Sequence, residues 1–186
     1  MPIVLALLLL AVFIGEIVAG AAGSERALVP LGALITRGWS SRDWWRVVTF
    51  SFLHLTWFHL ALNTAGLLWL GRIVERRRGR RTTVTVFIVG GITSGIAGML
   101  LGPLLPTTGV AVGASGAVCG LLAAAAIIAF RREADRRLRL PLMICLVAVI
   151  ATSLLPGVSL AGHIGGLVGG AAFAVTTDAS RFADQG

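Results

Sequence analysis

The stretch AGHIGGLVGG, residues 161–170, and the earlier stretch GASGAVCG, residues 113–120, are apolar sequences with glycines every three or four positions. On a helix this spacing gathers the glycines on one face, so that two such backbones can pack closely. Each stretch carries one polar side chain, His163 or Ser115. We therefore expect a seam between two helices that brings these two side chains together. Its glycines are Gly162, Gly166 and Gly170 on one helix and Gly113, Gly116 and Gly120 on the other.

The composition around this seam is that of a membrane protein. The chain has 186 residues, of which 56% are hydrophobic and 13% charged, and its mean hydropathy is +0.91. A soluble domain of this size could not bury that much apolar surface, so the expected surroundings are a lipid bilayer. All 16 basic residues are arginines, and they cluster between apolar runs. This pattern is typical of membrane orientation and argues against a nucleic-acid partner.

Six apolar runs predict an all-α, polytopic membrane protein with six transmembrane helices in a single domain, 1–186, without a soluble domain. The first run contains VAGAAG, which looks like a signal-peptide cleavage site, but it lacks a positively charged start and is long, so we expect a retained helix. The last three runs are short for a full crossing. The predicted helices are 2–22, 47–70, 84–101, 114–130, 140–155 and 160–175.

Arginine counting predicts the orientation. The links at 71–81 and 131–139, with the tail, place twelve arginines on one side of the membrane, whereas the loop 23–46 places four on the other. By the positive-inside rule both termini are cytoplasmic and the loop 23–46 is external. The expected location is the plasma membrane.

Three predicted helices then begin in the outer leaflet, and their polar residues share one depth. His54, His59 and Asn63 fall on the second helix, Ser115 on the fourth and His163 on the sixth. Taken singly, a serine can bond its own backbone, an asparagine can join helices, and a histidine can join helices or bind haem. Coincidence in depth across three helices favours a common site.

This set of side chains suits acyl transfer. A histidine that accepts the proton of a serine makes that serine a nucleophile, so Ser115 and His163 are candidates for a catalytic dyad. The acids at hand, Glu16 and Glu75, are not placed to complete a triad. The Ser115 backbone N–H, His59 and Asn63 are candidate donors to an oxyanion. No metal or cofactor is expected.

The same residues resemble the rhomboid family of intramembrane serine proteases. HLTWFHLALNTAGLLWLG is similar to the family's His-x4-His-x3-Asn helix, GASG to its Gly-x-Ser-Gly nucleophile motif, and AGHIGGLVGG to its histidine helix. WWRVVTF resembles the family's Trp-Arg pair (Trp45, Arg46), and GRIVERRRG its Gly-x3-Glu helix end (Gly71, Glu75). The match covers about residues 44–175. It implies the six-helix rhomboid fold, cleavage of transmembrane protein substrates in or near the bilayer, Ser115 as nucleophile, His163 as base, His59 and Asn63 as oxyanion donors, and a site open to the outer face.

One position departs from the family pattern. Bacterial relatives often have a tyrosine four residues after the serine, packed on the histidine, and here the residue is Cys119. The thiol itself, Trp57 or Phe58 are candidates to support the His163 ring. We expect Cys119 to be buried and inert, since nothing nearby lowers its pKa.

Other readings remain less favoured. An inactive relative that binds membrane clients would typically lack the serine or histidine. A transporter would need polar residues through both leaflets. A haem site would need His54 and His59 together, whereas five helical positions separate them by about 140°. The stretch SRDWWRV suits an interfacial anchor better than a substrate-handling loop.

Overall fold

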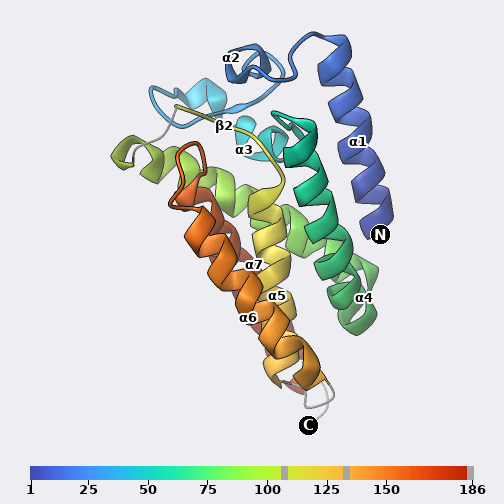
Figure 1. Ribbon diagram of the computed structural model, residues 1–186. Coiled ribbons are helices and arrows are strands. Elements are labelled where there is room, and N and C mark those ends of the chain that lie inside the picture. The colour runs from blue at the N-terminus through green and yellow to red at the C-terminus, as the bar shows by residue number, and fades with distance from the viewer. Residues whose placement is uncertain (106–108, 132–134, 184–186) are drawn as a thin grey trace.

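The computed structural model describes residues 1–105, 109–131 and 135–183, the last six as backbone only. The chain is mostly helical, as expected, and its long helices lie side by side (Figure 1). The long helices are α1 (Pro2–Val18), α4 (Trp57–Leu101), α5 (Ser115–Arg131), α6 (Arg136–Thr152) and α7 (Leu160–Ala183). The shorter elements are α2 (Glu25–Leu28), α3 (Arg46–Thr49), the 3-10 turns η1 (Ser41–Asp43), η2 (Phe50–Phe52) and η3 (Gly102–Leu104), and the strands β1 (Leu34–Ile35) and β2 (Val110–Ala111).

Helix α4 consists of two arms. Gly79 interrupts it with φ 86° and ψ 172°, a backbone conformation that a residue with a Cβ rarely adopts. The chain turns back there, so both arms extend away from the turn (Figure 1). Counting the arms separately, the described residues form six long helical segments.

The second predicted helix, 47–70, is wrong at its start. Residues 46–52 form α3 and η2, and the backbone at Leu53 is extended (ψ 148°). Helix α4 begins only at Trp57, where the Thr56 hydroxyl caps it by accepting the backbone N–H of His59 at 3.2 Å. An apolar run indicates that residues are buried or face lipid. It does not distinguish a helix from the packed turns that precede the helix.

Other predicted boundaries shift as well. The predicted helix 2–22 ends earlier, at Val18, and the predicted helix 160–175 continues to Ala183. The predicted helix 140–155 is observed as Arg136–Thr152, and 114–130 as Ser115–Arg131. The predicted helices 47–70 and 84–101 both extend to the Gly79 turn. Arginine is a good helix former, so the charged links that bound the apolar runs are largely helical themselves.

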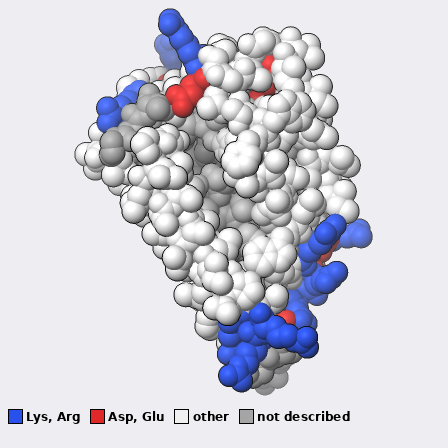
Figure 2. All heavy atoms as spheres, viewed as in Figure 1, with Lys and Arg blue, Asp and Glu red and all other residues white. Residues whose placement is uncertain are grey.

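Two described segments, Trp57–Leu104 and Leu160–Thr177, are long and apolar enough to cross a membrane, whereas α1 and α5 are apolar but shorter. Length and composition therefore identify two candidate spans, fewer than the six predicted. Charged side chains collect at the two ends of the molecule and leave a broad uncharged region between them (Figure 2). One charged end is tied together by the ion pair of Arg77 in α4 with buried Asp135, which precedes α6.

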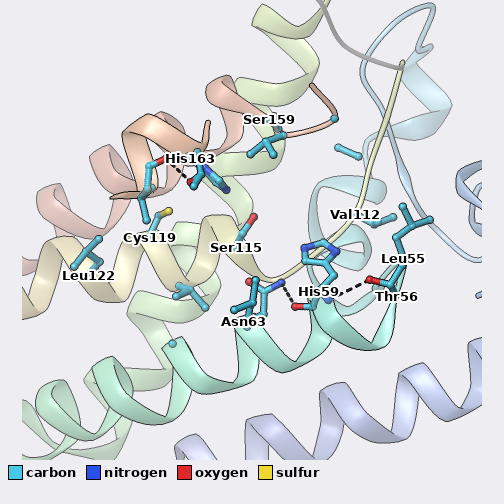
Figure 3. A pocket seen from close by; sticks show the side chains of 18 of the residues that line it. Leu55, Thr56, His59, Asn63, Val112, Ser115, Cys119, Leu122, Ser159 and His163 are labelled. Atoms are coloured by element: carbon cyan, nitrogen blue, oxygen red, sulfur yellow. Dashed lines mark hydrogen bonds between the residues drawn. The ribbon is translucent and has the colours of Figure 1, made fainter. Parts of the chain in front are cut away.

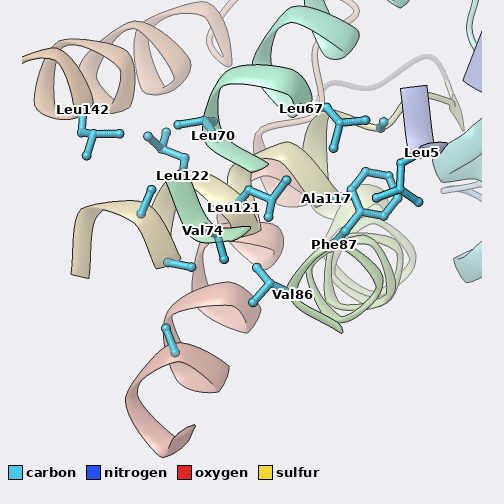
Figure 4. Close-up of a cluster of buried hydrophobic side chains, with 14 of the residues drawn as sticks. Leu5, Leu67, Leu70, Val74, Val86, Phe87, Ala117, Leu121, Leu122 and Leu142 are labelled. Carbon is cyan, nitrogen blue, oxygen red and sulfur yellow. The ribbon is translucent and has the colours of Figure 1, made fainter. Parts of the chain in front are cut away.

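The core lies around α5, which α4, α6 and α7 enclose (Figures 1 and 4). Six of its buried residues are alanines, and glycines of α4, α5 and α7 let the helices approach closely. Helix α1 adds one stripe, Leu5, Leu9 and Phe13, to the same cluster. The larger buried side chains of the cluster include Leu67, Leu70, Phe87, Leu121, Leu122, Ile128 and Leu142.

The segment before α4 is fixed to the bundle. Strands β1 and β2 pair antiparallel, with Leu34 opposite Ala111, and so tie this segment to the chain entering α5. The Arg46 guanidinium donates to the carbonyls of Val29 and Ala33 and to the Asp43 carboxylate. It also lies 4.6 Å from the ring centroid of Trp45. Arg46 is thus an internal brace of the segment.

Candidate active site

Ser115 is the first residue of α5, and it lines a cavity of about 510 Å³. Side chains of α4, α5, α6 and α7 form the cavity together with β2, and it reaches Thr36 near β1. His59, Asn63 and His163 line the same cavity, so the structure brings all four candidate residues together. Figure 3 shows Ser115 between His163 on one side and His59 on the other.

The glycine seam explains why α7 comes so near α5. A Cβ added at Gly166 would lie 2.1 Å from the carbonyl oxygen of Gly116, and one at Gly170 would lie 2.2 Å from that of Gly120. A Cβ at Gly116 would lie 3.4 Å from the Gly162 carbonyl oxygen, an ordinary contact distance, and its closest neighbour would be the Ser94 side chain of α4. The expected backbone packing is therefore present at these positions. Because Ser115 and His163 neighbour seam glycines, we expect the seam to set their separation.

Gly113 does not belong to this seam, contrary to expectation. It precedes α5 with φ +119°, and a Cβ there would lie 2.6 Å from His59 Nε2 and 3.5 Å from Asn63 Nδ2. Gly113 thus leaves room for the His59 ring beside the start of α5. Asn63 lies one turn after His59 and donates its amide N–H to the His59 carbonyl at 3.1 Å. Both side chains face the cavity with Ser115 (Figure 3).

His163 is buried in the first turn of α7. Ser159 precedes that helix and stabilises its start: its hydroxyl accepts the N–H of Gly162 at 3.1 Å, and its carbonyl accepts the N–H of His163 at 3.0 Å. The ring of His163 has a partner that sequence reasoning missed. Its Nδ1 lies 2.6 Å from Oγ of Ser153, the C-cap of α6. Acids are the expected partners of a catalytic histidine, and a serine near the end of an apolar run carries no distinguishing signal in the sequence.

Of the three residues predicted to support the His163 ring, only Cys119 lies on its side of the cavity. Trp57 packs edge-on against Phe13 of α1, and both Trp57 and Phe58 are exposed on the surface, so neither supports the ring. Cys119 is buried, and its sulfur is directed toward the part of the cavity near His163 (Figure 3). Cys145 of α6 lines the same cavity.

His54 was expected on the second helix, but it lies in the extended segment before α4. It is fully buried, and its backbone N–H donates to both carboxylate oxygens of Glu16, at 3.1 and 3.2 Å. Its ring centroid lies 5.2 Å from that of His59. The two histidines therefore do not share one helix, and the separation of about 140° predicted for them is wrong. Glu16, which the sequence did not connect to the site, anchors the segment that leads to His59.

Among the described residues, no group of three or more His, Cys, Asp or Glu side chains could hold a metal ion. The Ser115 hydroxyl has no hydrogen-bond partner among the residues that the structure describes. It is therefore available to a ligand in the cavity.

The fold and the cavity define a helical membrane protein in which a serine and a histidine from neighbouring helices share one pocket. Residues 41–179 match the family model for the Rhomboid domain. The chain belongs to the rhomboid family. It is 35% identical over 176 residues to the rhomboid protease GluP of Bacillus subtilis, covering 89% of this chain and 32% of that protein. It is 30% identical over 151 residues to the rhomboid-like protease 3 of Toxoplasma gondii, covering 80% of this chain and 57% of that protein.

A second Bacillus subtilis protein, the putative rhomboid protease YdcA, is 29% identical over 136 residues, which cover 72% of this chain and 67% of that protein. The chain thus spans about a third of GluP and somewhat more than half of the Toxoplasma protein.

Proposed function

We propose that this protein is an intramembrane serine endopeptidase that cleaves transmembrane protein substrates in or near the bilayer. The observation that carries the proposal is the meeting of Ser115 and His163 at one cavity, across a seam that permits no side chain. The protease names of its relatives support it. An inactive, client-binding protein is not favoured, because both reactive side chains are retained and face the same space.

In the proposed reaction the Ser115 hydroxyl attacks the scissile carbonyl while His163 Nε2 takes its proton. The backbone N–H groups of the first turn of α5 have no partner within the helix and lie at the positive end of its dipole. The Ser115 N–H is therefore one oxyanion donor, and the side chains of His59 and Asn63 supply the others across the cavity. His163 then returns the proton to the leaving amine. No cofactor takes part.

The distribution of charge supports the following proposed membrane arrangement. The six long helical segments cross the bilayer, and the end bearing the arginines of 72–81 and 136–139 faces the cytoplasm (Figure 2). Arg132, which contributed to the count, lies outside the described residues. The cavity and the segment 23–56 lie toward the opposite end, so the site opens to the outer face of the plasma membrane and both termini are cytoplasmic.

The direct test is active-site labelling in detergent or nanodiscs. A fluorophosphonate should label the wild type, and Ser115→Ala should abolish labelling. His163→Ala should lose cleavage of a model transmembrane substrate while still expressing. His59→Ala or Asn63→Ala should lower turnover by roughly 10- to 1,000-fold, as loss of an oxyanion donor does. Equal labelling of wild type and Ser115→Ala would refute the proposal.

A further inference from the structure

The hydrogen bond between Ser153 and His163 joins the end of α6 to the start of α7. Its two atoms, Oγ and Nδ1, are 2.6 Å apart, slightly closer than the usual 2.7–3.2 Å for an N–H···O bond. Both residues are buried, with 5% and 9% of their surface exposed. A buried bond of this length fixes the plane of the imidazole ring as well as its place in the cavity.

Counting protons identifies the donor in this bond. A serine hydroxyl has one hydrogen, and the Ser153 hydroxyl also lies 2.6 Å from the carbonyl oxygen of Val149. A carbonyl oxygen can only accept, so the hydroxyl hydrogen lies toward Val149. The Ser153 oxygen therefore accepts from His163, and the ring carries its hydrogen on Nδ1. The opposite assignment would leave two oxygens 2.6 Å apart with no hydrogen between them.

We propose that Ser153 is a positioning residue that holds His163 in the Nδ1–H tautomer, with the lone pair of Nε2 free to accept the proton of Ser115. The proposal deepens the proposed function and rests on it. Ser153 stands where a triad would have its carboxylate, but it is neutral and belongs to a different helix from both reactive residues.

The bond also serves the proton transfer itself. When the O–H bond of Ser115 breaks, its proton forms a bond to Nε2 and the ring becomes an imidazolium. The Nδ1–H then donates from a charged ring to the Ser153 oxygen, which strengthens this bond. The hydroxyl hydrogen of Ser153 stays bonded to its own oxygen and donated to the Val149 carbonyl throughout, so one proton moves and no second transfer is required.

The neighbouring turn keeps the acceptor in place. The backbone N–H of Ser153 donates to the Val149 carbonyl at 3.0 Å, and those of Leu154 and Leu155 donate to Ala151 and Thr152. His163 is held at its other end by the Ser159 carbonyl. Backbone and ring of the histidine are thus fixed from two sides of the 153–159 turn.

The first test observes the tautomer without any reaction. The protein has three histidines, so the ring ¹⁵N signals of His163 can be assigned by their loss in His163→Gln. In the wild type at a pH where the ring is neutral, Nδ1 should give the signal of a protonated nitrogen and Nε2 that of an unprotonated one. The reverse pattern would overturn the proposal, whatever the protein's activity.

The second test compares Ser153→Thr with Ser153→Val, two side chains of equal shape of which only one has the hydroxyl. Ser153→Val should lower kcat by roughly 10- to 100-fold with KM unchanged, the loss seen when metal-binding histidines lose their orienting partner. Ser153→Thr should restore most of this loss. Since the shapes match, a folding defect would lower the activity of both variants alike and would not change the ratio of their kcat values. Equal kcat values for Ser153→Thr and Ser153→Val would overturn the proposal.

A matched control variant and the labelling of Ser115 complete the design. Thr85→Val removes another hydroxyl bonded to a carbonyl four residues back, that of Arg81, far from the cavity, and should leave kcat unchanged. Labelling of Ser115→Ala at the wild-type rate would refute the proposed function, while the ¹⁵N result would still decide the tautomer. Normal Ser115-dependent labelling together with equal Thr and Val variants would refute the role of Ser153 alone.

Discussion

Substitution of Gly166 by alanine should separate α7 from α5 and impair the site without touching it. The added Cβ would lie 2.1 Å from the Gly116 carbonyl oxygen, and real Cβ atoms are essentially never closer than 3.0 Å. The neighbour is backbone, so the helices must move apart by about 1 Å, and overpacking of this kind costs about 1–3 kcal/mol. The gain from alanine in a helix, about 0.5–1 kcal/mol, offsets part of that. His163 lies one turn away, and a shift of about 1 Å between reacting groups costs roughly 100-fold in rate.

The assay pairs unfolding in detergent micelles with turnover of a model transmembrane substrate. Gly15→Ala in α1 is the matched control: nothing lies within 4 Å of the new Cβ, so neither property should fall. Gly170→Ala meets the Gly120 carbonyl oxygen at 2.2 Å but lies a further turn from His163. It should lose similar stability and less turnover. Wild-type stability and turnover in Gly166→Ala would refute the view that the seam sets the separation of Ser115 and His163.

Two further predictions concern the segment before α4. Glu16→Ala leaves the buried N–H of His54 without its acceptor and should lower the free energy of unfolding by about 1–3 kcal/mol, whereas Glu16→Gln keeps one acceptor oxygen and should lose less; equal unfolding midpoints would contradict this. Hydrogen bonds from the Ser40 backbone and Arg46 hold the pKa of Asp43 below its ordinary 3.8, so their contribution is present above about pH 4 and is lost as pH falls through the folded-state pKa. Hydrogen exchange of the backbone amides of residues 40–46, corrected for intrinsic rates, should therefore become faster in the wild type as the pH falls toward 3. In Asp43→Asn it should already be faster at pH 7. Unchanged exchange in both proteins would contradict a stabilising role of the Asp43 carboxylate.

The seam and the shared cavity could be predicted because both depend on periodicity. Glycines at helical spacing must fall on one face, and Ser115 and His163 are direct sequence neighbours of the seam glycines Gly116 and Gly162. Gly113 and His54 were placed wrongly because both lie just outside a helix, where the apolar run continues but the periodicity ends. Ser153 was missed for another reason. A hydrogen bond from a helix end depends on where a loop sends the next helix, and local sequence carries little trace of it.

The choice of a neutral partner for His163 follows from the surroundings. A carboxylate at the position of Ser153 would be a buried charge with a ring N–H as its main partner, and such burial is costly unless further donors are present. Glu16, a buried carboxylate near the cavity, faces the His54 backbone N–H and does not approach His163. A serine hydroxyl needs only one acceptor for its own hydrogen, and the helix end provides it in the Val149 carbonyl. The C-terminus of α6 thus supplies both the serine and the carbonyl that directs its hydrogen, and a histidine among apolar helices can be oriented without an acid.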